Sequence, residues 1–189
     1  MTDTEALDLF RQSGALLEGH FRLSSGLHSE RYLQSALVLQ HPDHAAALGA
    51  AIADRVRHLH PSVVLSPALG GIVIGQEVGR ALGVRAIFAE RQDGTLTLRR
   101  GFTMASTDRA VVVEDVITTG GSTRETIDVA IAVGARVVGA AAIIDRGDDA
   151  ARLGVALVAL VNLQVPAYRP ESCPLCAKGD PLTKPGSRV

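Results

Sequence analysis

The stretch VVVEDVITTGGS, from Val111 to Ser122, places three valines directly before two adjacent acids and a loop of small residues. A short apolar run of β-branched residues that ends in turn residues predicts a strand buried on both faces. A helical pattern begins near Ser122, so the chain leaves the sheet at Glu114 and Asp115. Open parallel sheets bind ligands at this carboxyl end of their strands.

The loop between the acids and the helix has the groups that bind an anion. Residues Thr118 to Ser122 offer backbone N–H groups, hydroxyls and the positive end of a helix dipole. The glycines allow close approach of the backbone to a ligand. The loop is therefore predicted to hold a phosphate.

The two carboxylates would repel a phosphate, so they are expected to face neutral hydroxyl groups or a metal ion. Adjacent residues of a strand point to opposite sides, which suits a sugar diol better than a compact metal cage. Ribose 5-phosphate satisfies both requirements, and no metal site built from protein ligands is expected. The order and spacing differ from those of a P-loop and of a dinucleotide-binding motif.

The rest of the chain predicts an α/β fold with a central, mostly parallel sheet flanked by helices. Apolar runs at 63–67, 85–90, 110–116, 137–145 and 155–161 alternate with helical patterns at 71–83 and 123–135. Before them we expect a helix from a Thr2–Glu5 capping box to about Leu17. A hairpin or extended segment follows over 20–34, and then a helix from Pro42 to near His60.

Composition sets broad limits on function. The chain of 189 residues is 47% hydrophobic and 21% charged, which predicts one domain spanning 1–189. A net charge of -1 argues against a nucleic-acid partner. No apolar run reaches membrane-spanning length and the N-terminus is an acidic helix start, so we expect a cytoplasmic protein without a membrane partner.

The two cysteines, Cys173 and Cys176, form a single CPLC motif. A lone CxxC lacks the second ligand pair of a structural zinc site, although a symmetric dimer could supply one. We interpret the motif as a reduced thiol pair in a terminal turn. The six histidines show no HExxH spacing, which argues against a zinc hydrolase.

Residues 91–102, RQDGTLTLRRGF, interrupt the apolar pattern with a polar, arginine-containing segment. The residues after Gly94 alternate as a short ribbon would. The segment is either a surface hairpin or a mobile lid over a site.

The stretch VVVEDVITTGGS resembles the phosphoribosyl pyrophosphate (PRPP) motif of the type I phosphoribosyltransferases. FRLSSGLHSERYLQ, the PALGG loop at 67–71 and IIDR at 143–146 resemble the members of that family that act on orotate. The resemblance implies a small N-terminal hood segment over 1–40, a flexible catalytic loop and a C-terminal tail over 170–189. It also implies that PRPP reacts with orotate in pyrimidine biosynthesis.

The resemblance carries roles to individual residues. It implies Mg²⁺ bound mainly through the substrate pyrophosphate, and a homodimer in which loop 91–102, beginning at Arg91, completes the partner's site. Orotate would contact Thr118, Arg146, Ser25 and Gly26. PRPP would contact Glu114, Asp115, Val116, Ile117, Thr118, Thr119, Gly120, Gly121, Ser122, Gly70 and Gly71.

The chain departs from the family pattern at its lysines. Family members have lysines where this chain has Ser24, Gly70 and Gln92, and a loop histidine that is missing here. We expect Arg99 and Arg100 to replace them as catalytic residues together with Arg91. Two alternatives stay open: a purine-base phosphoribosyltransferase, and a non-catalytic regulator that senses PRPP or nucleotides.

Overall fold

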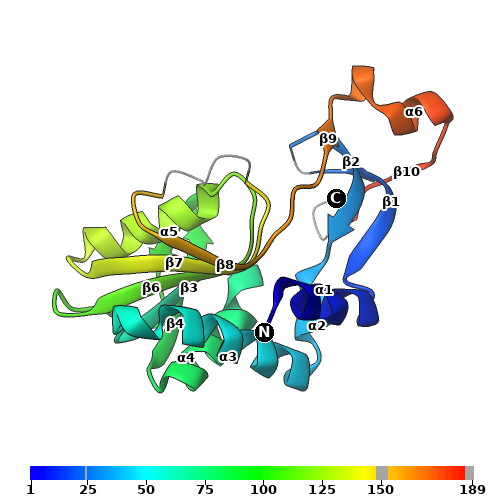
Figure 1. The fold of residues 1–189 in the computed structure, drawn as a ribbon. Coiled ribbons are helices and arrows are strands. Elements are labelled where there is room, and N and C mark those ends of the chain that lie inside the picture. Colours follow the sequence, from blue (N-terminus) through cyan, green and yellow to red (C-terminus); the bar gives the residue numbers. More distant parts are fainter. Residues whose placement is uncertain (24, 148–152, 186–189) are drawn as a thin grey trace.

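The computed structural model of the protein describes residues 1–23, 25–147 and 153–185 (Figure 1). Its strands form two sheets, a larger one in the body of the molecule and a smaller one beside it. Ser24 and the last four residues of the expected C-terminal tail, 186–189, lie outside the described residues.

The larger sheet has six strands in the order β5-β4-β3-β6-β7-β8. Neighbouring strands are parallel except for β4 and β5, which are antiparallel. The predicted mostly parallel sheet is confirmed. The strands are β3 (Val63–Pro67), β4 (Arg85–Gln92), β5 (Thr95–Leu98), β6 (Arg109–Ile117), β7 (Arg136–Asp145) and β8 (Leu157–Asn162).

Helices cover both faces of this sheet (Figure 1): α3 (Pro42–Val56) and α4 (Gly70–Leu82) lie on one face, and α5 (Gly121–Ala132) lies on the other. Val111 and Val113 belong to the core cluster that contains residues of α3 and α4, whereas Val112 packs in a cluster with Ile127 of α5. All three valines are fully buried. Each such burial stabilises the fold by about 1.5–3 kcal/mol.

The smaller sheet, which we call the hood sheet, has the order β10-β1-β2-β9. Its central strands β1 (Leu16–Arg22) and β2 (His28–Leu33) form an antiparallel hairpin, as one of the two alternatives for this segment predicted. The outer strands β9 (Ala167–Tyr168) and β10 (Leu182–Thr183) come from the other end of the chain. The expected division into a hood at 1–40 and a separate tail is therefore incomplete, because the tail supplies two of the four strands.

The first helix, α1 (Asp3–Gln12), begins at the predicted capping box. The Glu5 backbone N–H donates to the Thr2 hydroxyl at 3.3 Å, and the Thr2 backbone N–H donates to the Glu5 carboxylate at 2.7 Å. The predicted end at Leu17 is wrong, because the chain turns at Gly14 and Leu17 pairs in β1. The other short elements are α2 (Ser35–Leu39), η1 (Arg57–Leu59), η2 (Pro170–Ser172) and α6 (Pro174–Lys178).

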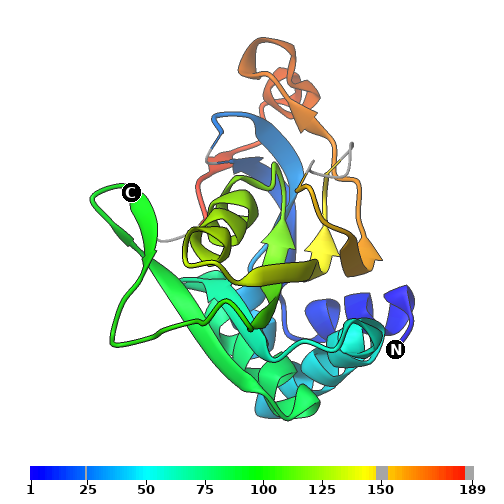
Figure 2. The same cartoon turned by 90° about the vertical axis from the view of Figure 1, so that its left-hand side faces the viewer.

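Residues 91–102 contain a hairpin turn, as one of the two alternatives for this segment predicted. Strands β4 and β5 pair from Ala89 to Leu98 around a two-residue turn at Asp93 and Gly94, whose positive φ values of 51° and 85° suit a tight hairpin. Figure 2 shows this green ribbon extending outward from the body of the molecule. Within the described residues, no helix combines the length and the apolar character that crossing a membrane requires.

Candidate active site

The carboxyl end of β6 lies where two cavities meet. One cavity, of about 1210 Å³, is lined by Gly70 and is called the Gly70 cavity here. The other, of about 1260 Å³, is lined by Arg146 and is called the Arg146 cavity. Asp115 lines both, together with residues of the hood hairpin. Asp115 is therefore the point that a ligand spanning the two cavities would pass.

The two acids have different surroundings. Glu114 lines neither cavity, and its Oε2 atom is buried without a hydrogen-bond partner. Burial, together with the neighbouring charge of Asp115, raises the pKa of Glu114 to about 9. Burial also raises the pKa of Asp115. Both acids resist ionisation until hydroxyl groups or cations approach them, which is typical of a site built for a ligand.

The loop after β6 leads into the start of α5, where the sequence predicts an anion site. Gly120 occupies the N-cap position with φ 70°, and no side chain caps the helix. The first N–H groups of α5 are therefore left for a ligand. Thr118 and Thr119 are exposed and line the Arg146 cavity. Ser122 is also exposed, on the first turn of α5.

The two hydrophobic residues after the acid pair, Val116 and Ile117, differ in what their side chains contact. Val116 lines the Arg146 cavity, whereas Ile117 is 1% exposed and packs in the core cluster with Ile127. The side chain of Ile117 thus faces away from the cavity. Its carbonyl accepts a 2.8 Å hydrogen bond from the Arg146 backbone N–H, which joins the ends of β6 and β7.

The loop before α4 approaches the acid pair from the neighbouring strand. A Cβ atom at Gly70 would lie 2.7 Å from a carboxylate oxygen of Asp115, so the glycine allows the loop to approach this acid closely. Leu69 is 83% exposed and lines the Gly70 cavity. Gly71 lies behind it against the carbonyl of Val113 and does not line the cavity. Of the two predicted glycines, Gly70 is the one that faces the ligand space.

Arg146 supplies positive charge in the second cavity. Its Nε atom is buried and has no hydrogen-bond partner, and burial lowers the pKa of its guanidinium group. A half-buried guanidinium whose Nε atom has no acceptor is available to a bidentate partner such as a carboxylate. Ser25 lines both cavities and Gly26 lines the Gly70 cavity, so the hood turn closes the site from the opposite side.

Comparison with known proteins agrees with this geometry. The model of a family described as Phosphoribosyl transferase domain matches residues 35–154. Orotate phosphoribosyltransferase of Heliobacterium modesticaldum is 53% identical over 191 residues, covering 100% of both chains. The enzyme of the same name from Pelotomaculum thermopropionicum is 52% identical over 188 residues, covering 100% of this chain and 99% of the other. The chain belongs to the orotate phosphoribosyltransferase family.

Solved structures of that family share the fold. Orotate phosphoribosyltransferase from Aeropyrum pernix superposes with a TM-score of 0.71 at 29% identity, covering 82% of this chain and 92% of the other. The Mycobacterium tuberculosis enzyme in complex with PRPP gives a TM-score of 0.66 at 25% identity, covering 84% and 94%.

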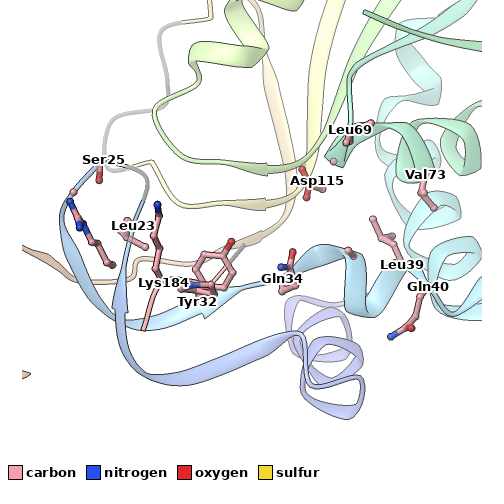
Figure 3. A pocket seen from close by; sticks show the side chains of 15 residues that line it. Leu23, Ser25, Tyr32, Gln34, Leu39, Gln40, Leu69, Val73, Asp115 and Lys184 are labelled. Carbon is pink, nitrogen blue, oxygen red and sulfur yellow. The ribbon is translucent and has the colours of Figure 1, made fainter. Parts of the chain in front are cut away.

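The structure also brings to the Gly70 cavity residues that sequence reasoning missed. Arg22, Tyr32, Gln34 and Lys184 line the Gly70 cavity, and the first three belong to the hood hairpin or follow it directly. Figure 3 shows Tyr32 and Lys184 pointing from the hood toward the strand end that carries Asp115. Lys184 is one of two lysines in the chain, a signal that was present in the sequence. Its position depends on the pairing of β10 with β1, which sequence alone did not indicate.

The three arginines of residues 91–102 lie away from the two cavities of this chain. Arg91 donates to the Gly94 carbonyl and forms a 2.9 Å ion pair with Glu125. Arg100 makes two hydrogen bonds to Glu90, at 2.7 and 2.8 Å. Neither of them, nor Arg99, lines the Gly70 or the Arg146 cavity. The chain therefore does not bring the arginines of residues 91–102 to these two cavities.

Proposed function

We propose that this chain transfers the ribose 5-phosphate group of PRPP to orotate, giving orotidine 5'-phosphate and pyrophosphate, as a step of pyrimidine biosynthesis. The observation that carries the proposal is the convergence on one cleft of Asp115, the loop that leads into the uncapped start of α5, and Arg146 with its unpartnered Nε atom. Full-length relatives at about half identity bear the name of this activity.

The substrates divide between the two cavities according to their charges. The 5-phosphate binds the N–H groups and hydroxyls from Thr118 to Ser122, and the ribose diol hydrogen-bonds the carboxyl groups of Glu114 and Asp115. Orotate places its carboxylate on Arg146 in the Arg146 cavity. The pyrophosphate occupies the Gly70 cavity, whose lining includes the basic side chains Arg22 and Lys184.

The reaction needs no nucleophile from the protein. The bond between the anomeric carbon and pyrophosphate breaks, pyrophosphate leaves with the electron pair, and a ring nitrogen of orotate forms the new bond and loses its proton. The site therefore acts by positioning the two substrates and by stabilising charge on the ribosyl group and on the leaving pyrophosphate. Arg22 and Lys184 supply positive charge where the family's lysines are missing.

Mg²⁺ fits this site as a companion of the substrate. Asp115 offers a hard oxygen ligand between the cavities, and the pyrophosphate oxygens would provide further ligands of the kind that Mg²⁺ prefers. The chemistry that bound Mg²⁺ supplies is neutralisation of charge on the departing pyrophosphate. Asp115 would orient it through a direct or water-mediated contact.

A homodimer would explain the position of the loop arginines. The ribbon of β4 and β5 extends outward, and Arg99 and Arg100, which directly follow β5, line neither cavity of their own chain. We infer that they reach the pyrophosphate of a partner subunit. Mixing an R99A/R100A variant with a site-defective D115N variant should restore activity, because mixed dimers contain one site with both functions. No recovery on mixing would contradict this arrangement.

The direct test is orotate consumption in the presence of PRPP and Mg²⁺. We expect loss of orotate with one equivalent of pyrophosphate released per turnover. Turnover of adenine or another purine base in place of orotate would support the purine alternative. Tight PRPP binding without release of pyrophosphate with any base would support a regulator.

A further inference from the structure

Four side chains that bind soft and borderline metals converge in the hood, outside the two cavities. His20 lies in β1, His28 begins β2, and Cys173 and Cys176 belong to the tail segment at α6. One ligand atom from each residue lies within 4.8 Å of the corresponding atoms of the others. The sequence expectation that the CxxC lacks a second ligand pair within its own chain is wrong. The histidines, about 150 positions earlier, supply it.

The distances between the ligand atoms match a tetrahedral ion. A zinc ion with two sulfur and two nitrogen ligands sets S···N separations of ~3.6 Å, from bond lengths of about 2.3 and 2.0–2.1 Å. The Cys173 and Cys176 sulfurs lie 3.6 and 3.7 Å from His20 Nε2, and Cys176 Sγ lies 3.3 Å from His28 Nδ1. The two imidazole nitrogens are 2.9 Å apart, closer than the ~3.4 Å of a bound pair, so the rings would separate slightly around an ion.

The tautomer of His20 is fixed in the form that a metal requires. His20 Nδ1 lies 2.9 Å from the backbone carbonyl of Asp180, and a carbonyl can only accept, so Nδ1 carries the proton. His20 Nε2 then presents its lone pair to the cluster. A hydrogen bond from the other imidazole nitrogen to a backbone carbonyl is the usual support of a histidine that ligates a metal.

Hydrogen bonds within the cluster cannot supply a partner for each of its four ligand atoms. His20 Nε2 has one lone pair, yet His28 Nδ1 and both sulfurs approach it. His20, His28 and Cys173 are 4%, 5% and 4% exposed, so water does not readily supply further partners. A cation at the centre would be shared by all four atoms. The cysteines are free thiols, which leaves both sulfurs available as ligands.

We propose that His20, His28, Cys173 and Cys176 bind one structural zinc ion per chain. Two thiolates and two imidazoles in a tetrahedral arrangement favour Zn²⁺ among the common divalent ions. The ion joins β1 and β2 to the segment between β9 and β10, and so fixes the C-terminal tail on the hood. Lys184 directly follows β10, so the ion also holds that side chain over the Gly70 cavity.

The first test is the metal content of the full-length protein, purified under reducing conditions without chelators. Elemental analysis should find about one zinc per chain in the wild type and in the control H58N, which changes an exposed histidine outside the cluster. C173S, C176S and H20N should lose stoichiometric zinc. Retention of zinc by all three variants, or a wild type that holds no zinc after incubation with excess ion, would overturn the proposal.

The second test uses the wild type alone and therefore does not depend on whether the variants fold. Exchange of zinc for Co²⁺ should produce the intense visible bands of tetrahedral cobalt and a thiolate charge-transfer band in the near ultraviolet. Zinc should also raise the thermal midpoint of the stripped protein by several degrees, because an ion that binds the folded chain stabilises it. A cobalt spectrum typical of six oxygen ligands, or a Cys173–Cys176 disulfide in the purified protein, would contradict the site.

Discussion

The end of β6 and the hood sheet contribute to the same cleft, but they are assembled in different ways. The acid pair, the anion loop and the start of α5 are contiguous from Glu114 to Ser122, so local spacing places them. The hood unites β1 and β2 with β9 and β10, which lie more than 130 residues further along the chain. A site whose residues are contiguous can be detected in the sequence as a motif. A site whose residues are brought together by long-range strand pairing appears in the sequence only as scattered residues.

The strongest test of this contrast removes both carboxyl groups of the contiguous part. The double variant E114Q/D115N should lower kcat/KM for PRPP by roughly 10³-fold, because hydrogen bonds to charged groups each contribute about 1.5–3 kcal/mol. Steady-state kinetics with orotate measures the effect. D128N, an exposed acid on α5, is the control. A loss of less than tenfold would show that the motif does not hold the ribose diol.

The next test concerns the residue that connects the motif to the second substrate. R146Q should raise KM for orotate by roughly 10²-fold, since removing one partner of a buried charged contact costs about 2–5 kcal/mol. KM for PRPP should change much less. The control R136Q alters an exposed arginine at the opposite end of the same strand, β7. Equal rises in both KM values would mean that Arg146 supports the fold of the site rather than orotate.

A smaller effect would show that the hood takes part in the chemistry. K184A should weaken PRPP and pyrophosphate binding by about tenfold, because Lys184 is an exposed cation and contributes one charged contact at the lower end of the usual range. K178A, which changes the other lysine of the same tail, should leave both unchanged. Isothermal titration calorimetry with inorganic pyrophosphate and Mg²⁺ measures the pyrophosphate affinity of each variant. If K184A and K178A bind pyrophosphate with identical affinity, the hood has only a structural role.

The smallest expected effect is a gain in stability. The pKa of Glu114 is about 9 in the folded chain against 4.5 for an ordinary glutamate carboxyl such as the unfolded chain exposes, so the unfolded state releases its proton at lower pH. The free energy of unfolding therefore falls as pH rises from about 4.5 to about 9. E114Q should remove this contribution and raise the ligand-free thermal midpoint at pH 8 by a few degrees. No gain at pH 8 relative to pH 5 would contradict the raised pKa.

The two regions also show how far sequence reasoning reached. The valine run and the glycine loop predicted a buried parallel strand followed by a helix, and the fold confirms both. The anion site between them stays a prediction. Gly71 and Ile117 illustrate the limit, because a residue inside a motif can still face the core. The end of α1 was misplaced because Leu16 and Leu17 are equally suited to a helix and to a half-buried strand. Pairing with β2 decided between them.

By itself, the sequence determined the strand-to-helix unit at Val111–Ser122, since backbone preference and side-chain periodicity act over a few residues. Only the tertiary structure decided that Arg22, Tyr32 and Lys184 face the same cavity as Asp115. It alone joined His20 and His28 to the CPLC motif. Strand pairing between distant segments depends on burial and hydrogen bonding of the whole sheet, which no local pattern encodes.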